Sequence, residues 1–349
     1  MKKRALGSTG MQLSPVSFGG ITVSSLSDEE TSRLVNDAID AGINYFDTAH
    51  SYADTSEKLG RVLPGRRDEV HVGAKVLDRT EKEAYERLTG SLDDLNMEYT
   101  DIMWLHAVDT EEMLDQVLGE GGAVHAIARC REEGLTRYLG ITGHRPDLIA
   151  RALKRFPFDV VMTPINYVYR FSFNAEGGLL PLCRRRGVGV VAIKPRAYQS
   201  IHDISDAYRY VLSQGVTTVI PHGTPEEMRM ALGVLDGLEE MSACEVESLL
   251  GSAPELEGRC RQCGFCLPCP EGIDIPRVLG LEDIWHGPHR VQGLRKGYHT
   301  QDWARHCYSE LGVSGKACTG CRVCEDRCPH GVPVAEMIAE SHRTLTLTE

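Results

Sequence analysis

The feature that most constrains the fold is an alternation, over residues 1–240, of eight short apolar segments with longer amphipathic ones. Several apolar segments are near-continuous runs rich in valine and isoleucine, which is typical of parallel strands buried on both faces. Capping-box patterns at Ser27–Glu30 and Thr80–Glu83 open two of the intervening helices. The predicted strands are residues 16–20, 44–49, 70–76, 101–107, 136–142, 159–166, 189–195 and 217–222.

Eight strand–helix units in succession predict a (β/α)8 barrel of the TIM type. The alternative is a doubly wound open sheet, which usually carries a G-x-G-x-x-G turn after its first strand. The corresponding segment, SFGGITVSS (17–25), lacks that spacing, so the barrel is favoured. Residues 3–15 are predicted to form a hairpin with its turn near residues 8–10, and residues 113–134 a single helix.

The net charge of −12 disfavours nucleic acid and anionic membrane surfaces as partners. No segment approaches the roughly 18 apolar residues of a membrane span, and the basic start MKKR is not followed by a signal-peptide core. We therefore expect a cytoplasmic protein. Its 349 residues exceed one barrel and leave room for a small second unit.

Polar residues stand at the carboxyl ends of three consecutive predicted strands, where barrels of this kind keep their catalytic groups. They are Asp47, with Tyr52 just after it, Lys75 and His106. Each residue alone has an ordinary explanation, such as a structural ion pair or a satisfied polar group. Four in order at one mouth favour catalysis.

These four side chains form a coherent proton-transfer set. A phenol has a pKa near 10, and a neighbouring ammonium lowers this pKa by favouring the phenolate. Lys75 can supply the ammonium and Asp47 can hold it, while His106 can donate a hydrogen bond to a substrate oxygen. Tyr52 would then protonate a carbonyl oxygen as hydride reaches the carbon, or catalyse the reverse.

The segments FDTAHSY (46–52), GAK (73–75) and WLH (104–106) resemble the catalytic segments of the aldo/keto reductase superfamily. LGSTGMQLSPVSFGG, AGINYFDTAHSY, REEGLTRYLGITGH and VTTVIPHGT extend the resemblance in order over residues 1–240. The resemblance implies a carbonyl or alcohol as small-molecule substrate. It also implies that Tyr52 is the proton donor, that Asp47 and Lys75 tune it, and that His106 orients the carbonyl.

NADP(H) is a further implication of the resemblance, but several of the family's nicotinamide marks are altered. Thr142-Gly143 stands for a Ser-Asn pair, Met162 for a glutamine, Ile193 for a stacking aromatic residue and Met230-Ala231 for a Glu-Asn pair. Thr142 and Asn166 are candidate hydrogen-bond partners of the cofactor. Lys194, Arg196 and Arg229 are candidate phosphate contacts, because the loops after strands seven and eight usually bind phosphate in barrels. The alternative is that these three side chains are ordinary charged groups exposed to solvent.

Two cysteine runs follow the barrel. The first is Cys260, Cys263, Cys266 and Cys269, and the second is Cys318, Cys321, Cys324 and Cys328. The second run has the C-x2-C-x2-C-x3-C-P spacing of bacterial ferredoxins, and the first is one residue shorter in its last gap. The sequence therefore predicts two 4Fe-4S clusters, each taking three cysteines from one run and the last cysteine of the other. Two zinc sites are the alternative.

The helical character of the residues between the runs resembles the dicluster ferredoxin units of anaerobic oxidoreductases. We therefore expect a barrel over 1–240, a helix and linker over 241–258, and a dicluster ferredoxin-type domain over 259–349, as in the ferredoxin-tailed branch of the aldo/keto reductases.

Three functional interpretations remain, because a cluster transfers one electron, a nicotinamide transfers a hydride, and no flavin fingerprint is present. The clusters can link a carbonyl–alcohol oxidoreductase to a ferredoxin or a redox complex. They can instead stabilise that enzyme or sense oxygen. In the third interpretation the chain is an electron-transfer subunit whose barrel is a docking module without nicotinamide chemistry.

Overall fold

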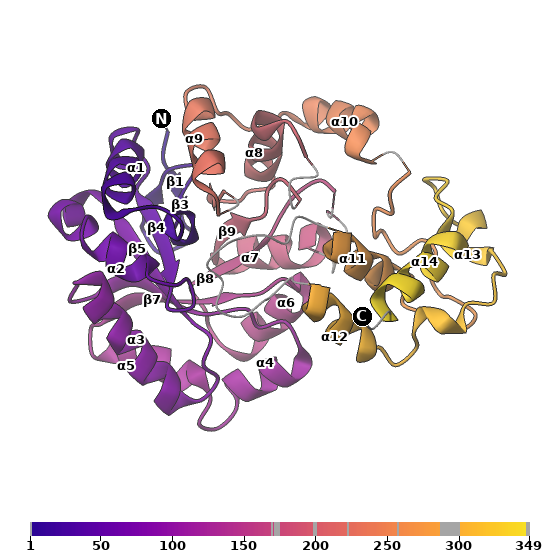
Figure 1. Cartoon of the computed structure of the whole chain (residues 1–349), viewed down its shortest axis with the longest axis horizontal. Coiled ribbons are helices and arrows are strands. Elements are labelled where there is room, and N and C mark those ends of the chain that lie inside the picture. Colours follow the sequence, from indigo (N-terminus) through magenta and orange to yellow (C-terminus); the bar gives the residue numbers. More distant parts are fainter. Residues whose placement is uncertain are drawn as a thin grey trace.

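The computed structural model describes residues 2–168, 170, 175–197, 201–221, 223–256, 258–286 and 301–346. His222, the last residue of the eighth predicted strand, lies outside these residues. A barrel occupies one side of the molecule and a group of helices from the C-terminal part occupies the other (Figure 1).

The barrel consists of eight parallel strands in the order β10-β9-β8-β7-β6-β5-β4-β3. A parallel bridge between Val16 and Val219, next to β3 and β10, closes the sheet on itself and confirms the predicted (β/α)8 barrel. The strands are β3 (Phe18–Gly19), β4 (Tyr45–Ala49), β5 (His71–Val76), β6 (Thr100–Leu105), β7 (Thr136–Thr142), β8 (Val160–Pro164), β9 (Gly189–Ile193) and β10 (Thr218–Val219).

The predicted hairpin is also confirmed. Strands β1 (Arg4–Ala5) and β2 (Gln12–Leu13) pair antiparallel. Leu6, Met11 and Leu13 belong to the same buried cluster as Trp104 and Tyr45 of the barrel interior. The hairpin therefore packs into the end of the barrel at which the strands begin.

Helices surround the barrel, and the predicted caps hold. Ser27 forms a complete capping box with Glu30 at the start of α1, and Thr80 accepts the Glu83 N–H at the start of α3. The barrel helices are α1 (Asp28–Asp40), α2 (Thr55–Gly60), α3 (Glu81–Leu95), α4 (Glu111–Leu118), α5 (Ala123–Glu132), α6 (Pro146–Arg155), α7 (Leu180–Arg186), α8 (Ile204–Ser213), α9 (Pro225–Val234) and α10 (Ala243–Ser252). Shorter 3-10 segments cover Gly20–Val23, Leu63–Glu69, Pro254–Leu256 and Gly315–Ala317, and a π-helix covers Ala175–Leu179.

The prediction of one helix over 113–134 is wrong, because glycines divide this segment into α4 and α5. Gly121 has φ +68°, a left-handed conformation that L side chains rarely adopt. Gly122 caps α5, and a Cβ there would lie 2.4 Å from the Gln116 carbonyl oxygen. The chain must therefore turn where continuous amphipathic spacing predicted a helix.

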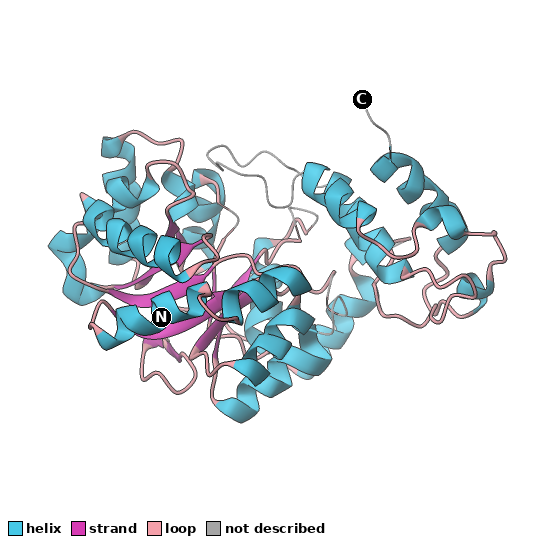
Figure 2. Cartoon of the chain, turned by 90° about the horizontal axis from the view of Figure 1, so that it is seen from below, coloured by secondary structure: helices cyan, strands magenta, loops and turns pink. Residues whose placement is uncertain are grey.

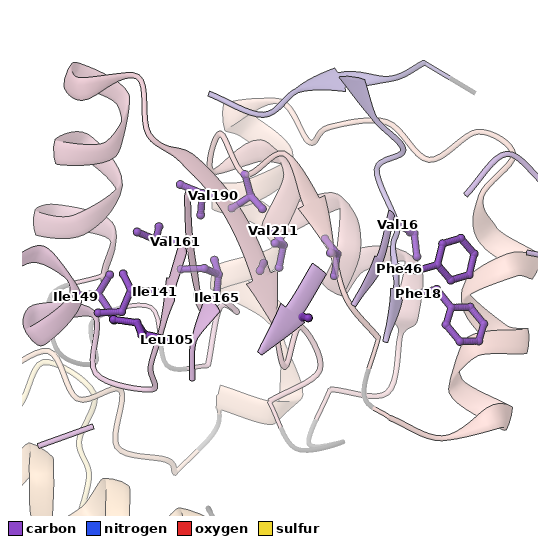
Figure 3. Close-up of a cluster of buried hydrophobic side chains, with 14 of the residues drawn as sticks. Val16, Phe18, Phe46, Leu105, Ile141, Ile149, Val161, Ile165, Val190 and Val211 are labelled. Carbon is purple, nitrogen blue, oxygen red and sulfur yellow. The ribbon is translucent and has the colours of Figure 1, made fainter. Parts of the chain in front are cut away.

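Apolar side chains fill the space between the sheet and its helices. Val161 and Val190 on the strands and Ile149 and Val211 on the helices belong to this cluster (Figure 3). Alternate residues of the same strands point into the barrel, where Trp104 is among the largest fully buried side chains. Gly140 on the neighbouring strand β7 makes room for its ring: a Cβ there would lie 2.2 Å from Trp104 Cε3.

The C-terminal helices form a second buried cluster that includes Ile275, Leu279, Tyr308 and Ile338. Leu256 still belongs to the barrel cluster, so α10 and the segment after it pack on the barrel. These helices are α11 (Ile275–His286), α12 (Gln301–Ser309), α13 (Val323–Asp326) and α14 (Val334–Thr346). They lie apart from the sheet, which stays within the barrel (Figure 2). In the part of the chain that the structure describes, no helix is long and apolar enough to cross a membrane.

We expect Gly140→Ala to lower the free energy of unfolding by about 1–3 kcal/mol, because the added methyl group overlaps the Trp104 ring in a packed interior. Gly90→Ala is the matched control: Gly90 lies within α3 with no neighbouring atom within 4 Å of an added Cβ, so it should stabilise by about 0.5–1 kcal/mol. Denaturant titration measures both changes. Equal unfolding midpoints for the two variants would contradict the packing described here.

Candidate active site

The pleat of three adjacent strands brings polar side chains to one end of the barrel. Asp47 lies two residues after Tyr45 on β4, Lys75 lies near the end of β5, and His106 directly follows β6. Ala49 is paired with Lys75, and Lys75 with Trp104, so the ends of the three strands lie side by side. Successive inward positions therefore stack a polar layer on top of the apolar barrel interior.

The structure brings the four predicted catalytic residues together. Lys75 Nζ forms an ion pair with Asp47 Oδ2, and both side chains are only 3% exposed. The same Nζ lies 3.3 Å from Tyr52 Oη and 4.8 Å from the centre of the Tyr52 ring. The imidazole of His106 meets that ring edge-on, with 5.8 Å between ring centres. The phenol thus contacts both an ammonium and an imidazole.

Burial decides the charge state of this phenol. Burial raises the pKa of Tyr52 above its usual value, and the lowering by Lys75 offsets this only in part. Lys75 therefore acts in the predicted direction, but the net shift is upward. Burial also raises the pKa of Asp47 against the opposing effect of Lys75. Although burial lowers the pKa of Lys75, the charges of Asp47 and Tyr52 outweigh it and raise that pKa overall.

His106 is neutral at physiological pH. Burial, followed by the charge of Lys75, holds its pKa well below the usual range. Arg79, a further contributor to this shift, donates hydrogen bonds to the backbone oxygens of His106 and Ala107. A neutral imidazole donates one hydrogen bond through a ring nitrogen, which suits the orientation of a carbonyl oxygen.

Two site residues escaped the sequence analysis. Trp104 Nε1 donates to Tyr45 Oη at 3.0 Å, and Tyr45 Oη donates to Asp47 Oδ1 at 3.4 Å. Tyr45 stands two residues before Asp47, and Trp104 two residues before His106. The period of two that placed the catalytic residues on the inner face of their strands therefore also points to these two residues.

A second polar pair lies at the same end of the barrel. His144 follows β7, and its Nδ1 lies 2.9 Å from Oδ2 of the fully buried Asp109 side chain. The backbone N–H of His144 donates to the other carboxylate oxygen at 2.5 Å. Burial raises the pKa of Asp109, but the charge and hydrogen bonds of His144 outweigh burial, so the pKa is lowered overall. This pairing was not predicted from the sequence.

The five predicted nucleotide contacts are distributed around the ends of β7 to β10. Thr142 Oγ1 accepts the Ala107 N–H at 2.9 Å, and Asn166 donates to the Lys194 backbone oxygen at 3.1 Å. Both side chains are almost fully buried. The two are thus tied into the barrel mouth by hydrogen bonds within the chain.

Of the cations among these contacts, Lys194 has φ +53°, and burial lowers its pKa to about 8. Arg196 donates to the buried Glu227 at 2.7 Å, so this pair carries no net charge. Arg229 lies on the exposed side of α9. Arg196 is therefore already neutralised by a carboxylate.

The eight cysteines of the two runs line two separate hollows, four to each. Cys260, Cys263 and Cys266 share one hollow with Cys328, while Cys318, Cys321 and Cys324 share the other with Cys269. None of these cysteines forms a disulfide. Within the described residues, no three His, Cys, Asp or Glu side chains lie close enough together to hold a metal ion as they stand.

Both runs have the same backbone pattern. The residue before the second cysteine and the residue after it have positive φ in each run: Gln262 and Gly264 in the first, Gly320 and Arg322 in the second. Each run then ends in Cys-Pro-x-Gly, with positive φ at Gly272 and Gly331. Gln262 and Arg322 adopt this conformation although it is unfavourable for side chains with a Cβ. The repeat CPEG/CPHG is therefore a further signal of the shared backbone pattern in the sequence.

Comparisons with known proteins agree with this barrel. L-galactose dehydrogenase of Arabidopsis thaliana is 32% identical over 212 residues, which cover 56% of this chain and 65% of that protein. An uncharacterized oxidoreductase, YqkF, of Bacillus subtilis is 28% identical over 211 residues, with the same two coverages. The chain thus spans just under two thirds of the length of these curated relatives.

Among solved structures, a putative aldo-keto reductase from Pseudomonas aeruginosa matches with a TM-score of 0.60 and 25% identity, over 68% of this chain and 94% of that one. A Bombyx mori aldo-keto reductase in complex with NADP matches in fold, with a TM-score of 0.55 and 16% identity over 72% of this chain and 92% of that one. The model of the aldo/keto reductase family matches residues 15–203, more than half of the chain. The chain therefore belongs to the aldo/keto reductase family.

Proposed function

We propose that the chain is an iron–sulfur oxidoreductase of the aldo/keto reductase type, which interconverts a carbonyl and an alcohol and exchanges electrons with a one-electron carrier. One observation carries the carbonyl chemistry: Lys75 contacts both Asp47 and Tyr52, and His106 makes an edge-on contact with the Tyr52 ring. A bound nicotinamide would supply the hydride.

In the reducing direction Tyr52 gives its proton to the carbonyl oxygen. Burial raises the pKa of the phenol further above neutral pH, so the acid form is present before reaction. The phenolate left behind is stabilised by Lys75, whose charge Asp47 maintains. The neutral His106 donates a hydrogen bond to the same carbonyl oxygen and directs it toward Tyr52.

For NADP(H), the residues of the barrel mouth allow a fit with fewer cations than the sequence predicted. Thr142 and Asn166 have buried polar groups at the strand ends, in reach of a cofactor that enters the mouth. Glu227 neutralises Arg196, so Arg196 is a weaker candidate for a phosphate contact than the sequence predicted. The relatives' nucleotides and substrates do not decide those of this chain, which shares just under two thirds of the length of its curated relatives.

We assign the two thiol hollows to two 4Fe-4S clusters in a ferredoxin-type domain over residues 259–349. Four thiolates are the usual ligands of such a cluster, and each hollow draws its fourth cysteine from the other run, as the spacing requires. The matching positive-φ pattern of both runs supports the same ligand role for both. The clusters would supply one-electron transfer, and the Gln262 N–H, 3.4 Å from Cys260 Sγ, would stabilise that thiolate. A ferredoxin or redox complex is the proposed partner.

A second candidate function is supported by the neutral Arg196–Glu227 pair and by the apolar Met162 and Ile193 at predicted nicotinamide positions. In that case the chain is an electron-transfer subunit, and its barrel docks a partner without nicotinamide chemistry. The intact Tyr52–Lys75–Asp47 arrangement favours the enzyme.

We expect Tyr52→Phe to lower kcat/KM for carbonyl reduction by about 10²- to 10⁴-fold, because the variant lacks the proton donor. Steady-state assays with NADPH or NADH and a panel of aldehydes measure this. Tyr85→Phe is the control, since it also removes a tyrosine hydroxyl, but one that bonds Glu133 on the surface. A kcat/KM of Tyr52→Phe equal to that of the wild type would contradict the assignment of Tyr52 as the proton donor. A wild type that binds neither nucleotide but exchanges electrons with a ferredoxin would favour the second candidate.

We expect anaerobically purified protein to contain about eight iron and eight sulfide per chain. Cys328→Ser and Cys269→Ser should each remove about half of the iron, because each cysteine completes a different cluster. Cys244→Ser is the control, because Cys244 is exposed and lies on α10, outside both hollows. Zinc in place of iron, or equal loss of iron in all three variants, would contradict the cluster assignment.

A further inference from the structure

A row of buried polar groups lies directly beneath the proposed catalytic site. Tyr45 and Asp47 point into the barrel from the same strand, and the Tyr45 hydroxyl donates to Asp47 Oδ1 while Lys75 occupies Oδ2. Trp104 on β6 donates to Tyr45 Oη. Tyr45 and Trp104 are completely buried. Each oxygen of the Asp47 carboxylate thus has its own donor.

The direction of these hydrogen bonds is fixed by chemistry. An indole N–H can only donate, so the Tyr45 oxygen must accept from Trp104. The proton of the Tyr45 hydroxyl is then available to Asp47, the acceptor on its other side. A phenol that accepts one hydrogen bond becomes a stronger donor in the next, because neighbouring hydrogen bonds polarise one another. Trp104 therefore strengthens the bond by which Tyr45 stabilises the Asp47 carboxylate.

The barrel leaves space for this pair at one strand position. A Cβ on Gly73 of β5 would lie 2.2 Å from Tyr45 Oη and 2.7 Å from Trp104 Nε1. Any side chain there would displace the two polar atoms that form the row. The absence of a side chain at residue 73 is thus a second observation, independent of the hydrogen bonds, that the polar pair requires.

We propose that Tyr45, oriented by Trp104, is a positioning residue that keeps Asp47 ionised and thereby maintains the Lys75 charge on which Tyr52 depends. This inference rests on the carbonyl chemistry proposed above. Tyr45 touches neither substrate nor cofactor. It acts through Asp47, which is paired with Lys75, which in turn contacts Tyr52.

The sign of the effect follows from the groups that face the row. Burial raises the pKa of Asp47, whereas Lys75 and the Tyr45 hydroxyl lower it. Beyond these groups, the charge of Asp101 on β6 raises the pKa of Tyr45. The pKa of His106 is lowered by the charges of three further residues, His144, Arg79 and His50. Loss of the Tyr45 hydroxyl removes one of the stabilising donors, so the pKa of Asp47 rises. The Asp47 carboxylate is then lost at a higher pH as the solution is acidified.

The test is Tyr45→Phe in the full-length, cluster-loaded protein, read in two ways. The ¹³Cγ resonance of Asp47, identified by its loss in Asp47→Asn, should titrate about one pH unit higher than in the wild type. The acidic limb of the pH profile of kcat should move upward by a similar amount, with kcat at neutral pH about tenfold lower. Trp104→Phe should give a smaller shift in the same direction, and it decides the question should Tyr45→Phe fail to fold.

Tyr138→Phe is the matched control. Its hydroxyl donates to the Thr9 backbone oxygen at the hairpin end of the barrel, so its removal should leave the Asp47 titration unchanged. An Asp47 titration that moves no further in Tyr45→Phe and Trp104→Phe than in Tyr138→Phe overturns the proposal. So does a lower kcat with both titrations unchanged, which would mark a purely structural role. The titration of the Asp47 resonance can be measured without turnover. Full activity in Tyr52→Phe would therefore contradict the proposed carbonyl chemistry, whereas it would leave the test of Tyr45 intact.

Discussion

The buried ion pair between Lys75 and Asp47 is the interaction on which the rest of the site depends. Taking two charges out of water costs several kcal/mol per ion, and their attraction offsets this only when further hydrogen bonds complete the geometry. Here the Tyr45 hydroxyl donates a hydrogen bond to one oxygen of the Asp47 carboxylate. Lys75 also contacts Tyr52 and approaches the Thr48 backbone oxygen. A buried pair of this kind is weak evidence for stability, so a chemical role accounts for it better.

The same burial determines the protonation state of Tyr52 in the free protein. Its raised pKa keeps the phenol protonated, but it also makes the phenol a weaker acid than an unperturbed tyrosine. In the proposed reduction of a carbonyl the proton is therefore in place, and release of that proton depends on Lys75, which stabilises the phenolate. The neutral His106 fits this state, because an imidazolium next to Lys75 would add a second positive charge to a buried site.

The positions of the proposed catalytic side chains could be predicted from the sequence, because the alternation of a strand fixes which residues face inward. The net pKa of Tyr52 could not, because desolvation depends on how strands distant in the chain pack around it. Nor could the pairing of Arg196 with Glu227, 31 residues apart on different elements. The break between α4 and α5, by contrast, could be predicted from Gly119, Gly121 and Gly122. The helical spacing of the apolar residues around these glycines favoured one continuous helix instead.

The position of the C-terminal helices bears on how the two halves of the chain work together. Cys307 lies on α12, and burial raises its pKa to about 12, with smaller effects from Asp109 and Arg145. Asp109 and Arg145 follow β6 and β7, at the carboxyl ends of the strands, so α12 lies on the mouth side of the barrel. The opposite end is closed by the hairpin residues Leu6 and Leu13. The helix that carries Cys307 and the Tyr52 site therefore lie on the same side of the barrel, an arrangement that the proposed exchange of electrons would need.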